Sequence, residues 1–376
     1  MNFETSEEQQ QLADSLGKYL ANYYDFEKRK AIIQSASGVS DAVWAAFAEM
    51  GLTAIALPEA DGGFGGGAQD LMAAMEACGQ ALVVEPLLDN IGLAARLVVR
   101  AGSMAQRATL LPGFIDGSMK LAFAGLEPGR RYELAPQSTT ARHAPEGWVL
   151  NGAKCVVIGA PSAGRLIVSA RSNDGACLFI VDPALPGVAL NPSRTVDGLR
   201  VADVRFDNVN LGADAMLGRS GGALPLIEEA TDFATALLCA EAIGAMQYAN
   251  DATLDYLKTR KQFGAPIGAN QVLQHRMVEM VIVTEQARSM AILAASKVDQ
   301  ATDSREGAKE RQRAVSAAKV KIADAARHVS QEAVQLHGGM GMTEELKISH
   351  TFRRLTMAAQ RFGDADHHLE RYAALG

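Results

Sequence analysis

The hydrophobic period of this chain changes twice. Up to about residue 120 apolar residues recur every three to four positions, as in Leu12, Leu16 and Leu20, which predicts helices. The pattern then alternates in short runs separated by Gly, Pro, Asn and Asp, which is typical of strands. After Leu211 and the Gly221-Gly222 pair the helical period returns. We therefore predict a mainly α protein with a central β-domain, divided into an N-terminal helical domain (1–120), a middle β-domain (121–215) and a C-terminal helical domain (216–376).

The C-terminal region reads as long helices. Its helical segments are expected at roughly 223–260, 268–300, 304–337 and 344–358. Some stretches, such as Ala234–Ala240, are apolar on nearly every side, which indicates helices that are covered on most faces. A four-helix bundle that also forms a subunit interface satisfies this pattern.

Composition excludes several classes of function. The 376 residues are 48% hydrophobic and carry a formal net charge of −7, with no run of Lys or Arg, which argues against nucleic-acid binding. No apolar run is long enough to cross a membrane, and the acidic N-terminus lacks a signal core. The four cysteines are scattered without CxxC spacing, so neither a zinc site nor a disulfide framework is expected. A cytoplasmic location fits best.

Two motifs carry most of the functional information. They are Arg260-Lys-Gln-Phe-Gly-Ala-Pro-Ile267 and Gln335-Leu-His-Gly-Gly-Met-Gly-Met342. Each ends a helical segment with a glycine turn that leaves backbone N–H groups uncovered, and the first adds a guanidinium. Together they could hold a pyrophosphate. The alternative is structural: Arg260 caps a helix C-terminus and Phe263 fills core.

This pair of motifs resembles the flavin-contacting motifs of acyl-CoA dehydrogenases, and the order of helices, β-domain and helical bundle is similar to that family's fold. The resemblance implies FAD as cofactor and oxidation of an acyl-CoA to the trans-2-enoyl-CoA, by α-proton abstraction and hydride transfer to flavin N5. It also implies an electron-transfer flavoprotein as electron acceptor. The implied FAD contacts are Arg260, Gln262, Phe263, Ile267 and Gln271, with Gln335, Gly338 and Gly339 from a neighbouring subunit.

The β-domain matches the family in part. Leu126-Glu127-Pro128-Gly129 resembles the start of a family loop beside the flavin, but Arg130-Arg131-Tyr132-Glu133 replaces the rest of it. Asn151-Gly152-Ala153-Lys154 matches a family turn, whereas the Trp-Ile-Thr that normally follows is Val156-Val157-Ile158. Without the indole and the threonine hydroxyl, the resemblance leaves backbone groups around Val157 and Ile158 as the flavin contacts.

The resemblance also implies where a catalytic carboxylate should lie. Phe362 and Ala234 occupy the two usual positions of the base, and neither can accept the α-proton. Glu241, in an otherwise apolar helix, is the first candidate. An ionised carboxylate there carries a desolvation cost unless it has a partner, and carboxylates in such surroundings are candidates for a general base. The alternative is an ion pair across the bundle with Arg276 or Arg288.

The C-terminal segment adds secondary candidates. Asp364 and Asp366 are second choices for the base, although the resemblance places Asp364 at the ribose side of the cofactor. His367 and His368 are adjacent on a helix and point in different directions, so we expect no metal site.

Several segments, including 362–369, resemble the small subunit of a heteromeric member of the family. We therefore expect a homodimer or homotetramer, or a heteromer with a larger acyl-CoA dehydrogenase subunit. Two alternatives stay open: an enzyme of the same fold that does not desaturate, such as a desulfinase or lyase, and a non-catalytic partner subunit.

Overall fold

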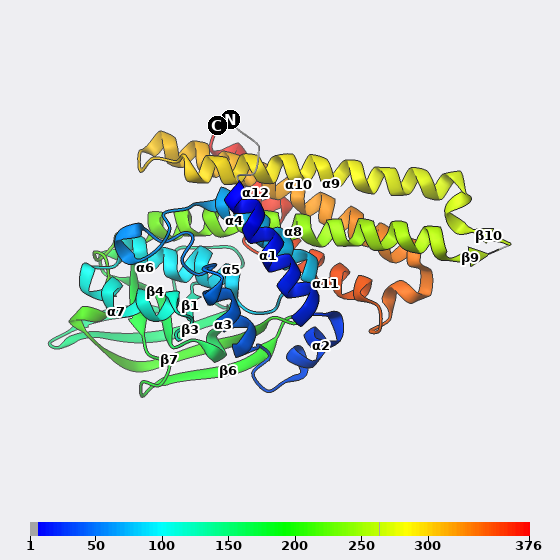
Figure 1. The fold of residues 1–376 in the computed structure, drawn as a ribbon. Helices are drawn as coiled ribbons and strands as arrows, with labels where there is room; N and C mark the ends of the chain where they lie inside the picture. Colours follow the sequence, from blue (N-terminus) through cyan, green and yellow to red (C-terminus); the bar gives the residue numbers. More distant parts are fainter. Residues whose placement is uncertain (1–6, 263) are drawn as a thin grey trace. The chain divides into compact units, whose positions relative to one another are not determined.

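The computed structural model describes residues 7–262 and 264–376, which form two compact units (Figure 1). The helical unit comprises the residues up to Arg29, Ala68–Val83 and Thr235–Gly376. The second unit comprises Lys30–Gly67 and Val84–Ala234 and contains the large sheet. Helices, then strands, then helices follow one another along the chain, so the predicted fold class is confirmed. The division at 120 and 215 stays a prediction.

The helical unit is built on long helices close to the predicted bounds. In α10 half of the buried positions are small, Ala or Ser, which lets its neighbours approach closely, and α10 packs against α9, α11 and α12. The helices of this unit are α1 (Glu7–Tyr23), α4 (Ala68–Ala81), α8 (Leu224–Thr259, in this unit from Thr235), α9 (Gln271–Asp299), α10 (Arg305–His337), α11 (Lys347–Gln360) and α12 (Ala365–Ala374). The short α12 was not predicted.

Two glycines let α4 and α8 cross at very short range. A Cβ added to Gly79 would lie 1.8 Å from the carbonyl oxygen of Glu241, and one added to Gly244 would lie 1.8 Å from that of Glu76. No other residue fits at either place, because such a contact is far inside van der Waals distance. The crossing sets the position of Glu241 relative to α4.

The second unit contains an eight-stranded sheet with the order β6-β7-β3-β2-β4-β5-β8, while β1 pairs with β4 in parallel. The strand β6 was not predicted, because its side chains are largely exposed and their alternation is confined to Val188 and Leu190 at its start. The strands are β1 (Leu121–Ala124), β2 (Thr140–Ala144), β3 (Gly147–Ile158), β4 (Arg165–Ser172), β5 (Gly175–Val181), β6 (Val188–Arg194), β7 (Arg200–Gly212) and β8 (Met216–Leu217).

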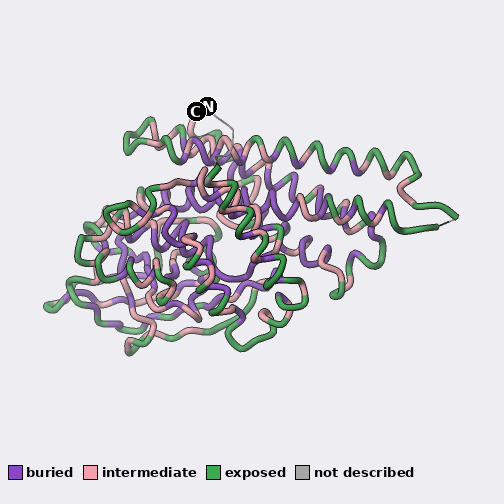
Figure 2. The backbone as a smooth tube through the Cα atoms, viewed as in Figure 1, coloured by how far each residue is buried: buried purple, intermediate pink, exposed green. Residues whose placement is uncertain are grey.

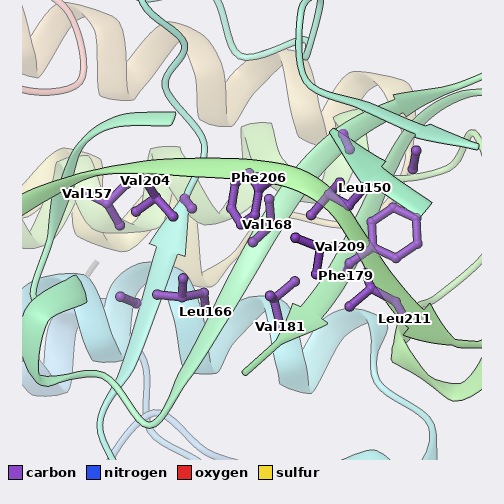
Figure 3. Packing of buried hydrophobic residues seen from close by; sticks show 14 of the residues in the cluster. Leu150, Val157, Leu166, Val168, Phe179, Val181, Val204, Phe206, Val209 and Leu211 are labelled. Atoms are coloured by element: carbon purple, nitrogen blue, oxygen red, sulfur yellow. The ribbon is translucent and has the colours of Figure 1, made fainter. Parts of the chain in front are cut away.

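The buried side of the sheet forms one apolar core, which Figure 3 shows from close by. Leu150 of β3 lies near Val209 of β7 and Phe179 of β5 there, whereas Val157 of β3 lies beside Val204 of β7. Alternating apolar positions on long paired strands bring these side chains to the same face. The side chain of Val157 is thus committed to the core.

Short helices complete the second unit. Within it, Ser103 caps α7 by accepting from the Gln106 N–H while the Gln106 side chain reaches back, a capping box. The helical elements are α3 (Asp41–Glu49), α5 (Leu87–Asp89), the π-helical turn Asn90–Ala95, α6 (Arg96–Ala101) and α7 (Met104–Ile115). α2 (Phe26–Gln34) begins in the helical unit and ends in this one.

Burial differs along the long helices (Figure 2). Residues 235–246 of α8 are buried, whereas the last turns of α8 and the first half of α9 are mostly exposed. None of the helices in residues 7–262 and 264–376 combines the length and apolar character required to cross a membrane.

Candidate flavin and acyl-CoA site

The Arg260 motif forms a small hairpin at the end of α8. β9 (Lys261–Gln262) pairs with β10 (Ala265–Pro266) around Gly264, whose φ of +83° suits glycine. The backbone N–H of Ile267 donates to the carbonyl of Arg260 at 2.9 Å. The side chains of Arg260, Gln262 and Gln271 are exposed and Ile267 is half-buried. Phe263 lies outside the described residues.

The glycine turn follows α10 directly. Gly338 has a φ of +61°, and a Cβ on Gly338 or Gly339 would meet nothing within 4 Å, so the space above this backbone is open. Gln335, in the last turn of α10, is also exposed. Both predicted pyrophosphate motifs therefore present accessible donors in the chain itself.

A ring stack joins the two motifs. The rings of Tyr256 and His337 are stacked, with centroids 4.4 Å apart and planes inclined by 29°. The carbonyl of Tyr256 accepts the backbone N–H of Arg260, and His337 is the residue before Gly338. Burial lowers the pKa of His337, whose Nδ1–H donates to the carbonyl of Ala333 at 2.8 Å, so the ring stacks as a neutral group. The sequence pattern did not predict this pair, although Tyr256 stands four residues before Arg260.

A β-bulge lies where the resemblance implies the flavin contacts of the β-domain. The β3–β7 register shifts between Lys154 and Val157, and Val156 has a φ of +51°, which is rare for a β-branched residue. The backbone N–H of Val156 donates to Oδ1 of Asp203 at 3.0 Å, and its side chain is 45% exposed. Ile158 is half-buried. Val157 therefore has only its main chain to offer a ligand.

The two degenerate β-domain motifs lie next to each other. The backbone N–H of Cys155 donates to the carbonyl of Leu126 at 2.9 Å, and Nζ of Lys154 lies 3.1 Å from Oε1 of Glu127. Lys154 also donates to the Ser169 hydroxyl at 3.0 Å. The exposed Leu126 and Val156 thus rest on a buried ion pair that the sequence analysis did not identify.

Hydrogen bonds keep that pair ionised. Burial alone raises the pKa of Glu127, but backbone N–H groups of Ser138, Thr139 and Gln137 and the charge of Lys154 outweigh it and hold the pKa well below its usual range. Burial lowers the pKa of Lys154 to about 8, against the opposing effect of Glu127. The loop that begins at Leu126 is therefore anchored by a charged centre at neutral pH.

The two positions at which the resemblance implies a base carry no carboxylate. Phe362 lies in the turn between α11 and α12, is half-buried and has a φ of +59°. Ala234 is fully buried in α8. Asp364 caps α12, since its Oδ1 accepts the backbone N–H of His367 at 2.9 Å, and Asp366 is exposed.

Glu241 is buried, with 6% of its surface exposed, and is paired with Arg354. Nη1 of Arg354 lies 2.5 Å from Oε1 of Glu241, and Nη2 donates to the carbonyl of Val83 at 2.9 Å. Arg276 and Arg288 bind Glu332 and Glu76 instead, so the alternative of an ion pair across the bundle holds with a different arginine. This geometry favours a structural role for Glu241.

The sequence matches three domain models of one family. They are the N-terminal domain of acyl-CoA dehydrogenase over residues 6–118, the middle domain over 122–209 and the C-terminal domain over 224–374. Among curated relatives, acyl-CoA dehydrogenase FadE12 of Mycobacterium tuberculosis is 31% identical over 365 residues, covering 93% of this chain and 90% of the relative. The human mitochondrial short-chain specific acyl-CoA dehydrogenase is 29% identical over 316 residues, covering 81% and 74%.

Solved structures with the same fold superimpose on this chain. A variant of the Tcur3481-Tcur3483 steroid ACAD superimposes with a TM-score of 0.87 at 30% identity, covering 98% of this chain and 97% of that one. Butyryl-CoA dehydrogenase from Megasphaera elsdenii shares the fold with a TM-score of 0.87 at 23% identity, covering 100% and 99%. The chain therefore belongs to the acyl-CoA dehydrogenase family of flavoprotein oxidoreductases.

Proposed function

We propose that this chain binds FAD through its two exposed motifs as one subunit of an acyl-CoA dehydrogenase that forms trans-2-enoyl-CoA. Two observations support the fit of a pyrophosphate in the helical unit. The Arg260 side chain is exposed at the end of α8, and the main chain at Gly338 and Gly339 is open where a Cβ would stand. When bound, FAD supplies the acceptor for the hydride that leaves the substrate β-carbon.

We further propose that the β3 bulge serves the flavin ring. Leu126 and Val156 are 37% and 45% exposed, an apolar surface in place of the missing indole. The main chain of Val157 and Ile158 supplies the polar contacts, since Val157 has its side chain in the core. Gln262, Ile267, Gln271 and Gln335 complete the proposed cofactor contacts of the helical unit, and Asp364 the ribose contact.

One observation supports a subunit that depends on a partner: the turn between α11 and α12, where the resemblance implies a base, carries Phe362. Glu241 remains the proposed base within the chain, and its use requires Arg354 to release it. Breaking a buried ion pair is costly, so a partner chain with its own carboxylate is the arrangement that the geometry supports best.

Exposed apolar residues support a partner. Val272, Val278, Val281 and Ile282 lie on the exposed first half of α9 and are 64%, 55%, 44% and 49% exposed. Val278, Val281 and Ile282 follow one another at three- and four-residue spacing and therefore share one face of the helix, and exposed apolar residues gathered in this way mark interaction sites. We propose a heteromer with a larger acyl-CoA dehydrogenase subunit, similar to the small subunit of pimeloyl-CoA dehydrogenase, in preference to a homodimer or homotetramer, with an electron-transfer flavoprotein as the acceptor.

The test is an anaerobic absorbance spectrum of the chain, purified alone and co-expressed with a candidate larger subunit, before and after addition of acyl-CoAs of different length. We expect flavin that bleaches with acyl-CoA in the complex and reoxidises with electron-transfer flavoprotein. Bleaching by the chain alone would show a self-sufficient enzyme and direct the search for the base to Glu241 first. Flavin absent from both preparations would contradict the cofactor proposal.

A further inference from the structure

A buried lysine holds the turn between α11 and α12. Lys319 of α10 is fully buried, and its Nζ donates to the carbonyl of Ala359 at 3.0 Å and to that of Gly363 at 2.7 Å. Burial lowers its pKa to about 8, so the ammonium form still predominates at neutral pH. Burying a cation costs desolvation free energy, which only its hydrogen bonds can offset. Both of these bonds go to the ends of one turn.

A buried histidine holds the middle of the same turn. His368 is 1% exposed, its Nε2–H donates to the carbonyl of Phe362 at 3.0 Å, and its Nδ1 lies 3.3 Å from the Ser316 hydroxyl. Burial, followed by the charge of Lys319, lowers its pKa to about 3, so the ring is neutral. Two interior side chains therefore fix three carbonyls between Ala359 and Gly363.

The backbone they fix is strained. Phe362 has a φ of +59°, a conformation that a bulky residue adopts only when its surroundings impose it. Gly363 has a φ of +119°, and a Cβ there would lie 2.5 Å from Cδ2 of His367 and 2.7 Å from Nε2 of His368. The turn cannot relax by shifting toward α12. Strain retained against relaxation in this way is typical of functional positions.

We propose that Lys319 and His368 are positioning residues that hold the Phe362 ring as a rigid apolar wall of the acyl-CoA site, where it selects among acyl groups. We call the hydrogen bonds from Lys319 and His368 to this turn the clamp. The selectivity rests on the proposed function, whereas the clamp rests on the contacts above. An aromatic ring at this place packs against hydrocarbon and takes up no proton. The position that is a base in relatives thus becomes a specificity determinant.

The clamp is tested by limited proteolysis, because trypsin cleaves after Arg361. We expect Lys319→Met to increase the rate of cleavage between Arg361 and Phe362 at least about tenfold in the native protein, since both bonds to the turn are lost. Lys321→Met, on the same helix with its Nζ on Gln286, is the matched control and should leave that rate unchanged. An unchanged rate in a folded Lys319→Met protein overturns the clamp.

A second pair of variants covers a failure of Lys319→Met to fold. His368→Phe removes the donor to the Phe362 carbonyl and should increase the same cleavage, whereas His368→Gln keeps an N–H at that place and should restore protection. Equal cleavage of the two variants would count against positioning by His368.

The selectivity is tested on the flavin-loaded protein or complex with a series of saturated acyl-CoAs. Phe362→Ala should change the order of half-saturating concentrations along the series, Lys319→Met should change it in the same direction, and Lys321→Met should not. An unaltered order in Phe362→Ala, in a protein that still bleaches, overturns the wall. Loss of flavin from the unmutated protein would instead be a failure of the proposed function, and the proteolysis result would stand.

Discussion

Arg354 joins Glu241 to the end of α4: one guanidinium nitrogen lies 2.5 Å from Oε1 of Glu241 and another donates to the carbonyl of Val83 at 2.9 Å. Neighbouring carbonyls have similar partners, since Lys347 donates to that of Gln80 at 2.7 Å and Arg29 to that of Leu82 at 2.6 Å. Cations at a helix C-terminus are favourable, because the carbonyls there have no partner within the helix. The ion pair is thus part of the framework of the helical unit.

Removing one partner of this pair should therefore lower the free energy of unfolding far more than removing both. We expect Arg354→Met to lower the free energy of unfolding by about 3–5 kcal/mol, because it leaves the Glu241 carboxylate buried and unpaired. The double variant Glu241→Met with Arg354→Met should recover most of that loss, and denaturant unfolding measures both. A double variant as unstable as the single one would show that the pair is not a unit.

A catalytic role of Glu241 has a separate signature. If it is the base, Glu241→Gln should retain flavin but slow its reduction by acyl-CoA at least about a hundredfold, the lower end for loss of a general base. Stopped-flow absorbance of the flavin reads this rate. Reduction at the unmutated rate would clear Glu241 of the role and leave it a structural residue.

The Arg260 guanidinium should contribute directly to flavin affinity. We expect Arg260→Ala to weaken FAD binding by roughly 1.5–3 kcal/mol, the range for hydrogen bonds to charged groups. Lys261→Ala, the adjacent exposed cation in β9, is the control and should have a smaller effect. Equal losses in both variants would indicate non-specific electrostatics in place of a defined contact.

The open backbone of the glycine turn gives a prediction that separates binding from folding. Gly339→Ala adds a methyl group where nothing lies within 4 Å, so the stability of the flavin-free chain should hardly change while FAD affinity falls. Gly17→Ala in α1 also enters open space and should stabilise the chain by about 0.5–1 kcal/mol, as is usual for a helix interior, without affecting FAD. Full affinity in Gly339→Ala would remove this turn from the cofactor site.

Stability should fall with acid before the carboxylates titrate. Burial, the leading cause at both sites, lowers the pKa of His350 to about 4 and that of His368 to about 3, so the folded chain binds fewer protons than the unfolded chain as the pH falls through 6.5. The contribution of these neutral rings is complete above that pH and declines below it. Thermal unfolding between pH 7 and 5 should show the decline, with a smaller slope for His368→Gln. An equal slope would mean that His368 does not contribute.

The sequence predicted the long helices well because their signal is local. The segment expected at 304–337 is α10 at Arg305–His337, and the hydrophobic period alone places it. Strand limits were harder, since the runs expected at Trp148–Leu150 and Cys155–Ile158 are one 12-residue strand, β3. A bulge keeps a strand continuous while breaking the alternation on which the expectation relied.

The contacts that define the candidate site were less accessible to sequence reasoning. Glu241 stood out as a charge in an apolar helix, but its partner Arg354 lies on α11, and several arginines were equally plausible from spacing. The donors that hold the strained turn at Phe362 come from two separate helices, α10 and α12. Such relationships arise from tertiary packing, which no local period encodes.

The bulge in β3 has one more consequence. Side chains along a strand alternate between its two faces, and an extra residue shifts that alternation by one step for everything that follows. Val157 points into the core because of this shift. Without Val156 a single residue would separate Lys154 from Val157, so regular alternation would keep both on the core side and only the exposed side chain at the bulge would be lost. The bulge therefore lets one strand keep Leu150 and Val157 in the core while it exposes Val156 at a surface open to a ligand.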